Sequence, residues 1–156
     1  VGFTTISENL SPREVVDLLN TLFEELTVEI FKEDGTLDKY VGDALIAFFV
    51  APEKQPDHAV RAVRAGLAMQ SRIAQVAAMH PEWPPLNMRI GINSGPAVVG
   101  DIGSIQRSDY TVIGDTVNIA SRLESQVAAR EKWWSVPIRL ASAPTSSRWS
   151  NCPSRH

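Results

Sequence analysis

The sequence has 156 residues and a single cysteine, Cys152, so it has no internal disulfide. This fits a reducing compartment. Long apolar runs are also missing: the longest, Ala44 to Ala51, is far shorter than the roughly 20 residues that a membrane-spanning helix needs. Nothing near the start is typical of a signal peptide. We therefore expect a cytoplasmic segment without membrane contact, although a parent protein could still be membrane-tethered.

An excess of positive charge is absent as well. The 15 Lys and Arg residues face 18 Asp and Glu residues, giving a formal net charge of -3. A surface that tracks nucleic-acid phosphates needs the opposite sign, so we expect no nucleic-acid partner. The hydrophobic fraction of 44% and charged fraction of 21% are ordinary values for one soluble globular domain.

The end of the chain contains no acidic residue at all. Residues 1–131 hold all 18 acids and 11 of the 15 bases, a net charge of -7, whereas residues 132–156 hold four bases. The second part is rich in serine, proline and tryptophan, and it follows neither a helical nor an alternating pattern. We predict a domain over residues 1–131 and a divergent, poorly ordered tail over 132–156.

Three helices are predicted between the ends. Ser11, Pro12 and Glu14 form the pattern of a capping box, so the first helix begins there and runs to the break at residues 33–35. Its predicted core face consists of Val15, Leu18, Leu19, Leu22 and Leu26. The second helix follows residues 55–57, ends near residue 80, and is expected to bury Val60, Val63, Leu67, Gln70 and Ile73. The third follows Asp115, its expected N-cap, and contains Val117, Ala120 and Leu123.

Strands are predicted around these helices. Residues 36–41 and 44–50 form a hairpin around Gly42 and Asp43, and the second of these strands is apolar on both faces. Residues 86–93 and 97–102 form a further pair around Ser94 and Gly95, and residues 110–113 form a short strand. If another strand ends just before Gly2, the order is that of a split βαβ, ferredoxin-like α+β fold with helices packed on an antiparallel sheet. Fold alone does not determine function.

Four segments in this order carry a specific resemblance. They are residues 1–5 (VGFTT), 39–43 (KYVGD), 89–95 with Gly100 (RIGINSG), and 110–124 (YTVIGDTVNIASRLE). Together they resemble the class III adenylate/guanylate cyclase catalytic domain, of the bacterial adenylate cyclase type. The resemblance covers about residues 1–126. Relative to the family, the chain is truncated at the N-terminus and divergent at the C-terminus.

The resemblance implies a metal and phosphate site at the turns. Members of the family hold two Mg²⁺ or Mn²⁺ ions with a pair of carboxylates, and Asp43 matches the second carboxylate. The first would lie before Val1. The turn formed by Gly2, Phe3 and Thr4 would face the triphosphate. On spacing alone, an ordinary turn aspartate would be the simpler interpretation of Asp43.

The resemblance also implies how the nucleotide is read. Lys39 and Thr111 match the two positions that select the purine, and lysine with threonine points to ATP. Asn118 and Arg122 share one face of the third helix and match the residues that orient the ribose and stabilise the transition-state phosphate. Without the resemblance, a solvated strand lysine, a strand threonine and a polar helix pair would be the simpler interpretations. Neither His58 nor His80 is a good candidate for a general base.

In the family, one subunit supplies the metal ligands and the other supplies the purine and phosphate readers. Since this chain carries both sets of residues, the resemblance implies a homodimer whose two sites are shared between the subunits. It also implies that the product is cyclic AMP with pyrophosphate. The expected role is signal transduction under the control of a sensor or regulatory domain. A second hypothesis is a catalytically inactive cyclase-homology module for dimerisation or regulation, because the first carboxylate and a late phosphate-binding lysine are not found in the sequence.

Overall fold

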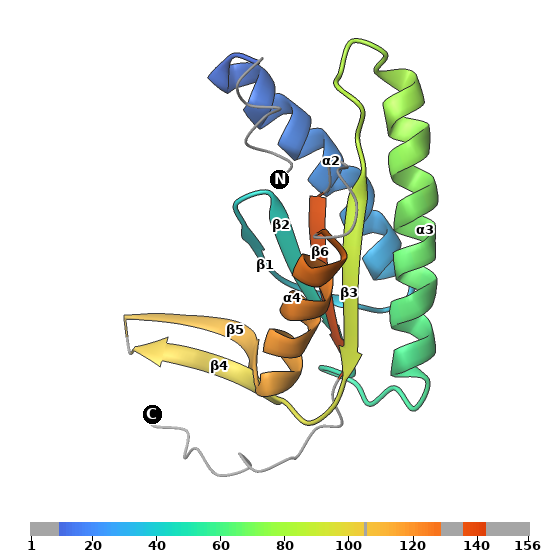
Figure 1. Cartoon of the computed structure of the whole chain (residues 1–156). Coiled ribbons are helices and arrows are strands. Elements are labelled where there is room, and N and C mark those ends of the chain that lie inside the picture. Colours follow the sequence, from blue (N-terminus) through green and yellow to red (C-terminus); the bar gives the residue numbers. More distant parts are fainter. Residues whose placement is uncertain (1–9, 105, 129–135, 143–156) are drawn as a thin grey trace.

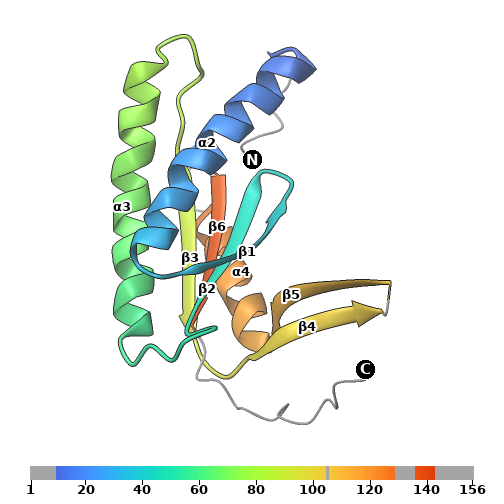
Figure 2. The same cartoon turned by 180° about the vertical axis from the view of Figure 1, so that it is seen from behind.

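A four-stranded sheet with helices on both faces forms the centre of the protein, as seen in a computed structural model that describes residues 10–104, 106–128 and 136–142 (Figures 1 and 2). Helices α2 and α3 cover one face, and α4 covers the other. The elements in chain order are α2 Pro12–Lys32, β1 Thr36–Val41, β2 Ala44–Phe49, α3 His58–Met79, β3 Met88–Ser94, β4 Val98–Ser104, β5 Arg107–Ile113, α4 Asp115–Ala128 and β6 Val136–Ser142.

The sheet order is β1-β2-β6-β3, and β4 pairs with β5 in a separate two-stranded sheet. β1 and β2 are antiparallel, as the hairpin pattern predicts, whereas β6 runs parallel to both β2 and β3. The predicted pairing of the strands around Ser94 and Gly95 is wrong. β3 pairs with β6 instead, and β4 turns away to pair with β5.

Residues 136–142 belong to the segment predicted as a poorly ordered tail, yet they form β6 inside the sheet. The segment has apolar residues at alternate positions, Val136, Ile138 and Leu140. The prediction missed this strand because Pro137 and the surrounding serines and prolines are typical of irregular chain. The domain boundary at residue 131 stays a prediction.

The helix α2 begins as the capping box predicts. The backbone N–H of Ser11 donates to Glu14 Oε2 at 2.7 Å, and the Ser11 hydroxyl accepts from the backbone N–H of Glu14 at 3.4 Å. Every side chain of β2 is buried, as predicted for a strand covered on both faces. Its alternate residues enter two clusters: Leu45, Ala47 and Phe49 join the core beneath α2 and α3, while Phe48 packs with Ala97 and Val112.

The helix α3 is present where predicted, but its predicted core face is only partly right. Ile73 is buried as predicted, whereas Val60, Val63 and Leu67 are 50%, 47% and 67% exposed. The buried face consists of Ala62, Ala65, Gly66, Met69, Ile73 and Val76. The small residues at positions 62, 65 and 66 allow α3 to lie close to the sheet.

The helix α4 rests directly on β3 at Gly91. A Cβ atom there would overlap the Ala120 carbonyl oxygen and lie 2.8 Å from the backbone nitrogen of Glu124. α4 begins at Asp115 itself, and the Val117 N–H donates to the Gly114 carbonyl. Asp115 is therefore the first helical residue and not the N-cap that the sequence suggested. Its charge still favours the positive end of the helix dipole.

We predict that Gly91→Ala lowers the free energy of unfolding by at least about 2 kcal/mol, because the added methyl group meets backbone atoms of α4 that have no room to move. Gly100→Ala in β4 is the matched control, since nothing lies within 4 Å of its Cβ position. Urea denaturation of the two variants measures the difference. Equal stabilities would contradict the close packing of α4 on β3.

Candidate nucleotide site

Asp43 lies in the turn between β1 and β2, and its side chain is half-buried. The turn depends on Gly42, whose φ of +63° lies in the left-handed region that glycine adopts readily. Figures 1 and 2 show this turn at the end of the sheet away from the β4–β5 hairpin. The carboxylate therefore sits at one end of the molecule, apart from the start of α4.

Lys39 and Thr111 come from two elements that contact each other, β1 and β5. The other strand of the same hairpin, β2, also approaches β5: the ring centroids of Phe48 on β2 and Tyr110 on β5 are 6.2 Å apart. Lys39 is exposed, whereas Thr111 is 6% exposed and its hydroxyl has no hydrogen-bond partner among the described residues. A buried hydroxyl without a partner costs free energy. Because the oxygen has almost no exposed surface, a ligand can reach it only if neighbouring side chains move.

Asn118 and Arg122 both lie on the exposed side of α4, four residues apart. Within the described ranges, Arg122 takes part in no ion pair. Its guanidinium is therefore available to an anion that approaches this face of the helix.

Three contacts fix the position of α4. Arg89 Nε and Glu124 Oε1 form an ion pair at 2.8 Å, although not with the geometry of a directed hydrogen bond, and the Glu124 side chain is only 3% exposed. Asn93 Nδ2 donates to the Thr116 carbonyl at 3.1 Å, and the Thr116 hydroxyl donates to the Pro96 carbonyl at 2.8 Å. The buried pair and the two hydrogen bonds hold the helix that carries Asn118 and Arg122 against the end of β3.

The structure thus places the predicted site residues on two parts of the fold. Thr111, Asn118 and Arg122 follow one another along β5 and α4, whereas Lys39 and Asp43 lie four residues apart on the β1–β2 hairpin. β1 contacts β5, and the turn that carries Asp43 lies at the end of the sheet away from the start of α4. Gly2, Phe3 and Thr4, predicted to bind the triphosphate, lie outside the described residues.

Both described histidines already have partners. His58 Nδ1 lies 3.0 Å from the Gln55 carbonyl oxygen, and its Nε2 lies 3.2 Å from the Ser94 hydroxyl. His80 pairs with Glu82 at 2.9 Å and stacks on Trp83 at a centroid distance of 3.9 Å. These contacts agree with the expectation that neither histidine is the general base.

Asp43 suits a divalent cation, because a carboxylate is the ligand that Mg²⁺ and Mn²⁺ prefer. However, the described ranges contain no group of three or more His, Cys, Asp or Glu side chains that could hold a metal ion. Asp43 fits as one ligand, and the described side chains do not complete a site for two ions.

Asp38 is a residue that the sequence reasoning missed. Its side chain is 3% exposed, its Oδ1 accepts no hydrogen bond from the described residues, and that oxygen lies 3.7 Å from Lys39 Nζ. The sequence contained no signal for this contact, because neighbouring residues of a regular strand point to opposite faces. The contact arises from an irregularity in the strand register that only the structure shows.

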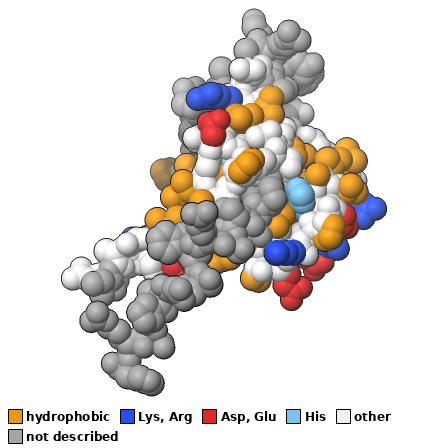
Figure 3. Space-filling model, turned by 90° about the horizontal axis from the view of Figure 1, so that it is seen from below, with side chains coloured by type: hydrophobic (Ala, Val, Ile, Leu, Met, Phe, Trp, Pro, Cys, Tyr) orange, Lys and Arg blue, Asp and Glu red, His pale blue; other side chains and the backbone are white. Residues whose placement is uncertain are grey.

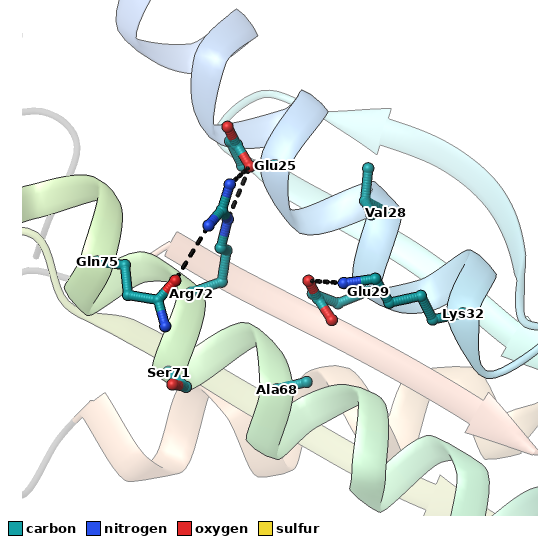
Figure 4. A pocket seen from close by; sticks show the side chains of 8 residues that line it. All are labelled: Glu25, Val28, Glu29, Lys32, Ala68, Ser71, Arg72 and Gln75. Carbon is teal, nitrogen blue, oxygen red and sulfur yellow. Dashed lines mark hydrogen bonds and ion pairs between the residues drawn. The ribbon is translucent and has the colours of Figure 1, made fainter. Parts of the chain in front are cut away.

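A hollow of about 370 Å³ lies between α2 and α3, away from all of these residues (Figure 4). Its polar side chains largely satisfy one another. Arg72 donates from Nε to Glu25 at 2.7 Å and from Nη1 to Gln75 at 3.0 Å. Lys32 pairs with Glu29 at 2.7 Å. None of the predicted site residues lines this hollow.

Comparison with known proteins identifies the family. Residues 1–132 match the model of the adenylate and guanylate cyclase catalytic domain. The chain belongs to this cyclase family. The predicted resemblance and the α+β cyclase fold are therefore confirmed.

The relatives include cyclases of both nucleotide types. Adenylate cyclase 1 of Rhizobium meliloti (strain 1021) is 43% identical over 127 residues, which are 78% of this chain and 19% of that protein. The adenylyl cyclase CyaB from P. aeruginosa superposes with a TM-score of 0.69 at 36% identity, covering 80% of this chain and 66% of that one. The guanylyl cyclase Cya2 superposes with a TM-score of 0.72 at 40% identity, covering 80% and 64%. Similarity alone thus leaves the choice of nucleotide open.

The cyclase chain spans about a fifth of the length of the R. meliloti relative. None of the helices in the described ranges is long and apolar enough to cross a membrane.

We predict that Thr111→Val leaves the free energy of unfolding unchanged or raises it by about 1 kcal/mol, because the change removes a buried hydroxyl that has no partner. The same change weakens ATP binding if the hydroxyl contacts the purine. Thr116→Val is the matched control: its hydroxyl donates to Pro96, so the loss destabilises the cyclase domain by about 1 kcal/mol. Urea denaturation and titration with a fluorescent ATP analogue measure both effects. A clear loss of stability in Thr111→Val would show that its hydroxyl is already used within the fold.

Proposed function

We propose that the chain is the catalytic domain of an adenylate cyclase that converts ATP to 3′,5′-cyclic AMP and pyrophosphate. The observation that carries the choice of ATP is the Lys39 and Thr111 pair on two contacting strands, with a buried Thr111 hydroxyl that has no hydrogen-bond partner among the described residues. The family membership supports the cyclase reaction itself.

The two side chains suit adenine. The Lys39 ammonium has only donors and would donate to an unprotonated ring nitrogen of adenine, whereas guanine carries a proton on N1. The Thr111 hydroxyl both donates and accepts, so it can accept from the exocyclic amino group of adenine. A purine that satisfied this hydroxyl would relieve the cost of leaving it buried without a partner.

Asn118 and Arg122 suit the sugar and the reacting phosphate. The Asn118 amide can hold the ribose so that its 3′ hydroxyl faces the α-phosphorus. The Arg122 guanidinium presents planar donors to the phosphate oxygens, whose negative charge grows as the 3′ oxygen attacks and pyrophosphate leaves. Such electrostatic stabilisation is often worth several kcal/mol. With both described histidines engaged elsewhere, we propose that a phosphate oxygen of the substrate takes the proton of the 3′ hydroxyl.

Asp43 is the residue of this chain that we expect to bind Mg²⁺ or Mn²⁺. When bound, a divalent ion neutralises charge on the phosphates and on the entering and leaving oxygens. The Asp43 carboxylate would keep the ion at the turn between β1 and β2. We expect two ions per site, with the remaining ligands supplied by the substrate, by water and by residues outside the described ranges.

The position of the β1–β2 turn supports a homodimer. The turn that carries Asp43 lies at the end of the sheet away from the start of α4 (Figures 1 and 2), so we expect a second chain to bring a carboxylate turn to each α4 face. Exposed apolar side chains on the strands around this region would be buried by such a partner. They are Tyr40, Val41, Val98, Ile102, Tyr110 and Ile113. Seen from below, hydrophobic side chains reach the described surface in several groups among charged ones (Figure 3).

A second candidate function is an inactive module for dimerisation or regulation. The observation that favours it is the lack of a complete metal-ligand group among the described residues. In either case, we expect the domain to act in intracellular signalling, in the cytoplasm, under a sensor or regulatory domain of a longer protein.

We predict that the purified chain forms cyclic AMP from ATP in the presence of Mn²⁺, and much less cyclic GMP from GTP. The assay is run on the chain itself and on a version extended upstream by the first strand that the family has. Chromatography of the products measures both cyclic nucleotides. Nucleotide binding without a cyclic product in either preparation would favour the inactive module.

We also predict that an equimolar mixture of Asp43→Ala and Arg122→Ala chains regains about a quarter of the wild-type activity, while each variant alone is nearly inactive. One of the two shared sites in each mixed dimer then has both residues intact, and half of the dimers are mixed if exchange is random. An Arg64→Ala chain mixed with Asp43→Ala serves as the control for dilution, since Arg64 lies outside the proposed site. If the two site variants do not complement each other, the shared site is wrong.

A further inference from the structure

Among the described residues, the ion-pair partner of the buried Asp38 carboxylate is Lys39. The Asp38 side chain is 3% exposed, and its Oδ1 lies 3.7 Å from the Nζ of Lys39, whose own side chain is 46% exposed. No hydrogen bond from any described residue reaches that oxygen. Burying a carboxylate without a partner costs free energy, so we expect the nearby Lys39 ammonium to stabilise the buried Asp38 carboxylate.

The contact between Asp38 and Lys39 depends on a bulge in β1. Along β1, Leu37 pairs with Ala47 and Lys39 pairs with Ile46, so two steps on β1 match one step on β2. The extra residue is Asp38. A bulge of this kind turns a side chain away from its regular alternation, which lets the carboxylate of Asp38 and the ammonium of Lys39 approach each other although the residues are adjacent.

The other purine-reading position does not compete for this cation. Thr111 is neutral, so it leaves the charge of Lys39 uncompensated. The ammonium has three donors, and the contact with Asp38 leaves donors free on its exposed side. Asp38 therefore contacts one side of the Lys39 ammonium, while the exposed side of the ammonium stays available to a nucleotide.

We propose that Asp38 is a positioning residue for purine selection. It orients the Lys39 ammonium toward adenine, and its negative charge disfavours an acidic residue at position 39. This inference rests on the proposed function of Lys39 and Thr111. It adds a third residue to the choice of nucleotide and gives the buried carboxylate a role.

The proposal has a specific consequence for changing the nucleotide. In the variant Lys39→Glu with Thr111→Cys, the glutamate can accept hydrogen bonds from the N1–H and the amino group of guanine, and the thiol is a weak donor to its O6. The exchange also places a second carboxylate next to Asp38. Two like charges this close repel each other and displace the carboxylate that is meant to accept from guanine. The change to GTP should therefore be complete only when Asp38 is also neutralised.

The experiment compares Asp38→Asn, the double variant Lys39→Glu with Thr111→Cys, and the triple variant that adds Asp38→Asn. Dissociation constants for fluorescent ATP and GTP analogues are measured on the purified chains, with cyclic products as a second measurement. We expect Asp38→Asn to lower the preference for ATP over GTP about tenfold. The triple variant should prefer GTP at least about tenfold more strongly than the double variant.

Asp17→Asn, which neutralises an exposed aspartate on α2, is the control and should leave the preference unchanged. Urea denaturation verifies that each variant is folded, and Asp38→Ser replaces Asp38→Asn if the latter is not. A purely structural role would change stability and leave the ratio of the two dissociation constants as it is.

The outcomes separate the two proposals. If the wild-type chain prefers ATP but Asp38→Asn keeps that preference, and the double and triple variants behave alike, the role of Asp38 is overturned while the adenylate cyclase proposal stands. If the wild-type chain binds neither nucleotide, or prefers GTP, both proposals fail.

Discussion

The burial of β2 on both faces is the constraint on which the other features depend. Phe49 and its alternate neighbours complete the core under α2 and α3, while Phe48 reaches the opposite side and packs with Val112 of β5. Each large side chain buried in this way contributes about 1.5–3 kcal/mol. Because one strand serves both clusters, the hairpin that carries Lys39 and Asp43 is held at a set position relative to β5 and the start of α4.

Much of this arrangement could be predicted from local patterns. The capping box at Ser11, the apolar stripe of α2, the turn at Gly42 and the continuous apolar run of β2 each depend on residues close in sequence, and each was found as expected. The patterns failed where distant segments decide the outcome. The face of α3 that is buried depends on how closely the helix approaches the sheet. β3 pairs with β6, which lies far along the chain, and this leaves β4 to pair with the adjacent β5.

The candidate site shows the same division. The identities of Lys39, Thr111, Asn118 and Arg122 could be recognised from motifs, and the structure shows that the first two lie on contacting strands. Their surroundings could not be recognised in this way. The unpartnered hydroxyl of Thr111 and the buried carboxylate of Asp38 result from packing and from one irregular step in β1, neither of which has a fixed sequence pattern. Charge and burial around a motif can therefore adjust its specificity without altering the motif.

The position of β6 affects how this protein reaches its fold. β6 lies between β2 and β3, but it comes from the end of the chain, so Leu45 must find Ile138 across most of the sequence. During synthesis, β2 and β3 emerge long before their shared neighbour, and their facing edges stay unpaired until residues 136–142 leave the ribosome. Contacts between such distant segments slow folding, and unpaired strand edges favour association with other chains. Newly made chains are thus most exposed to aggregation just before β6 is complete.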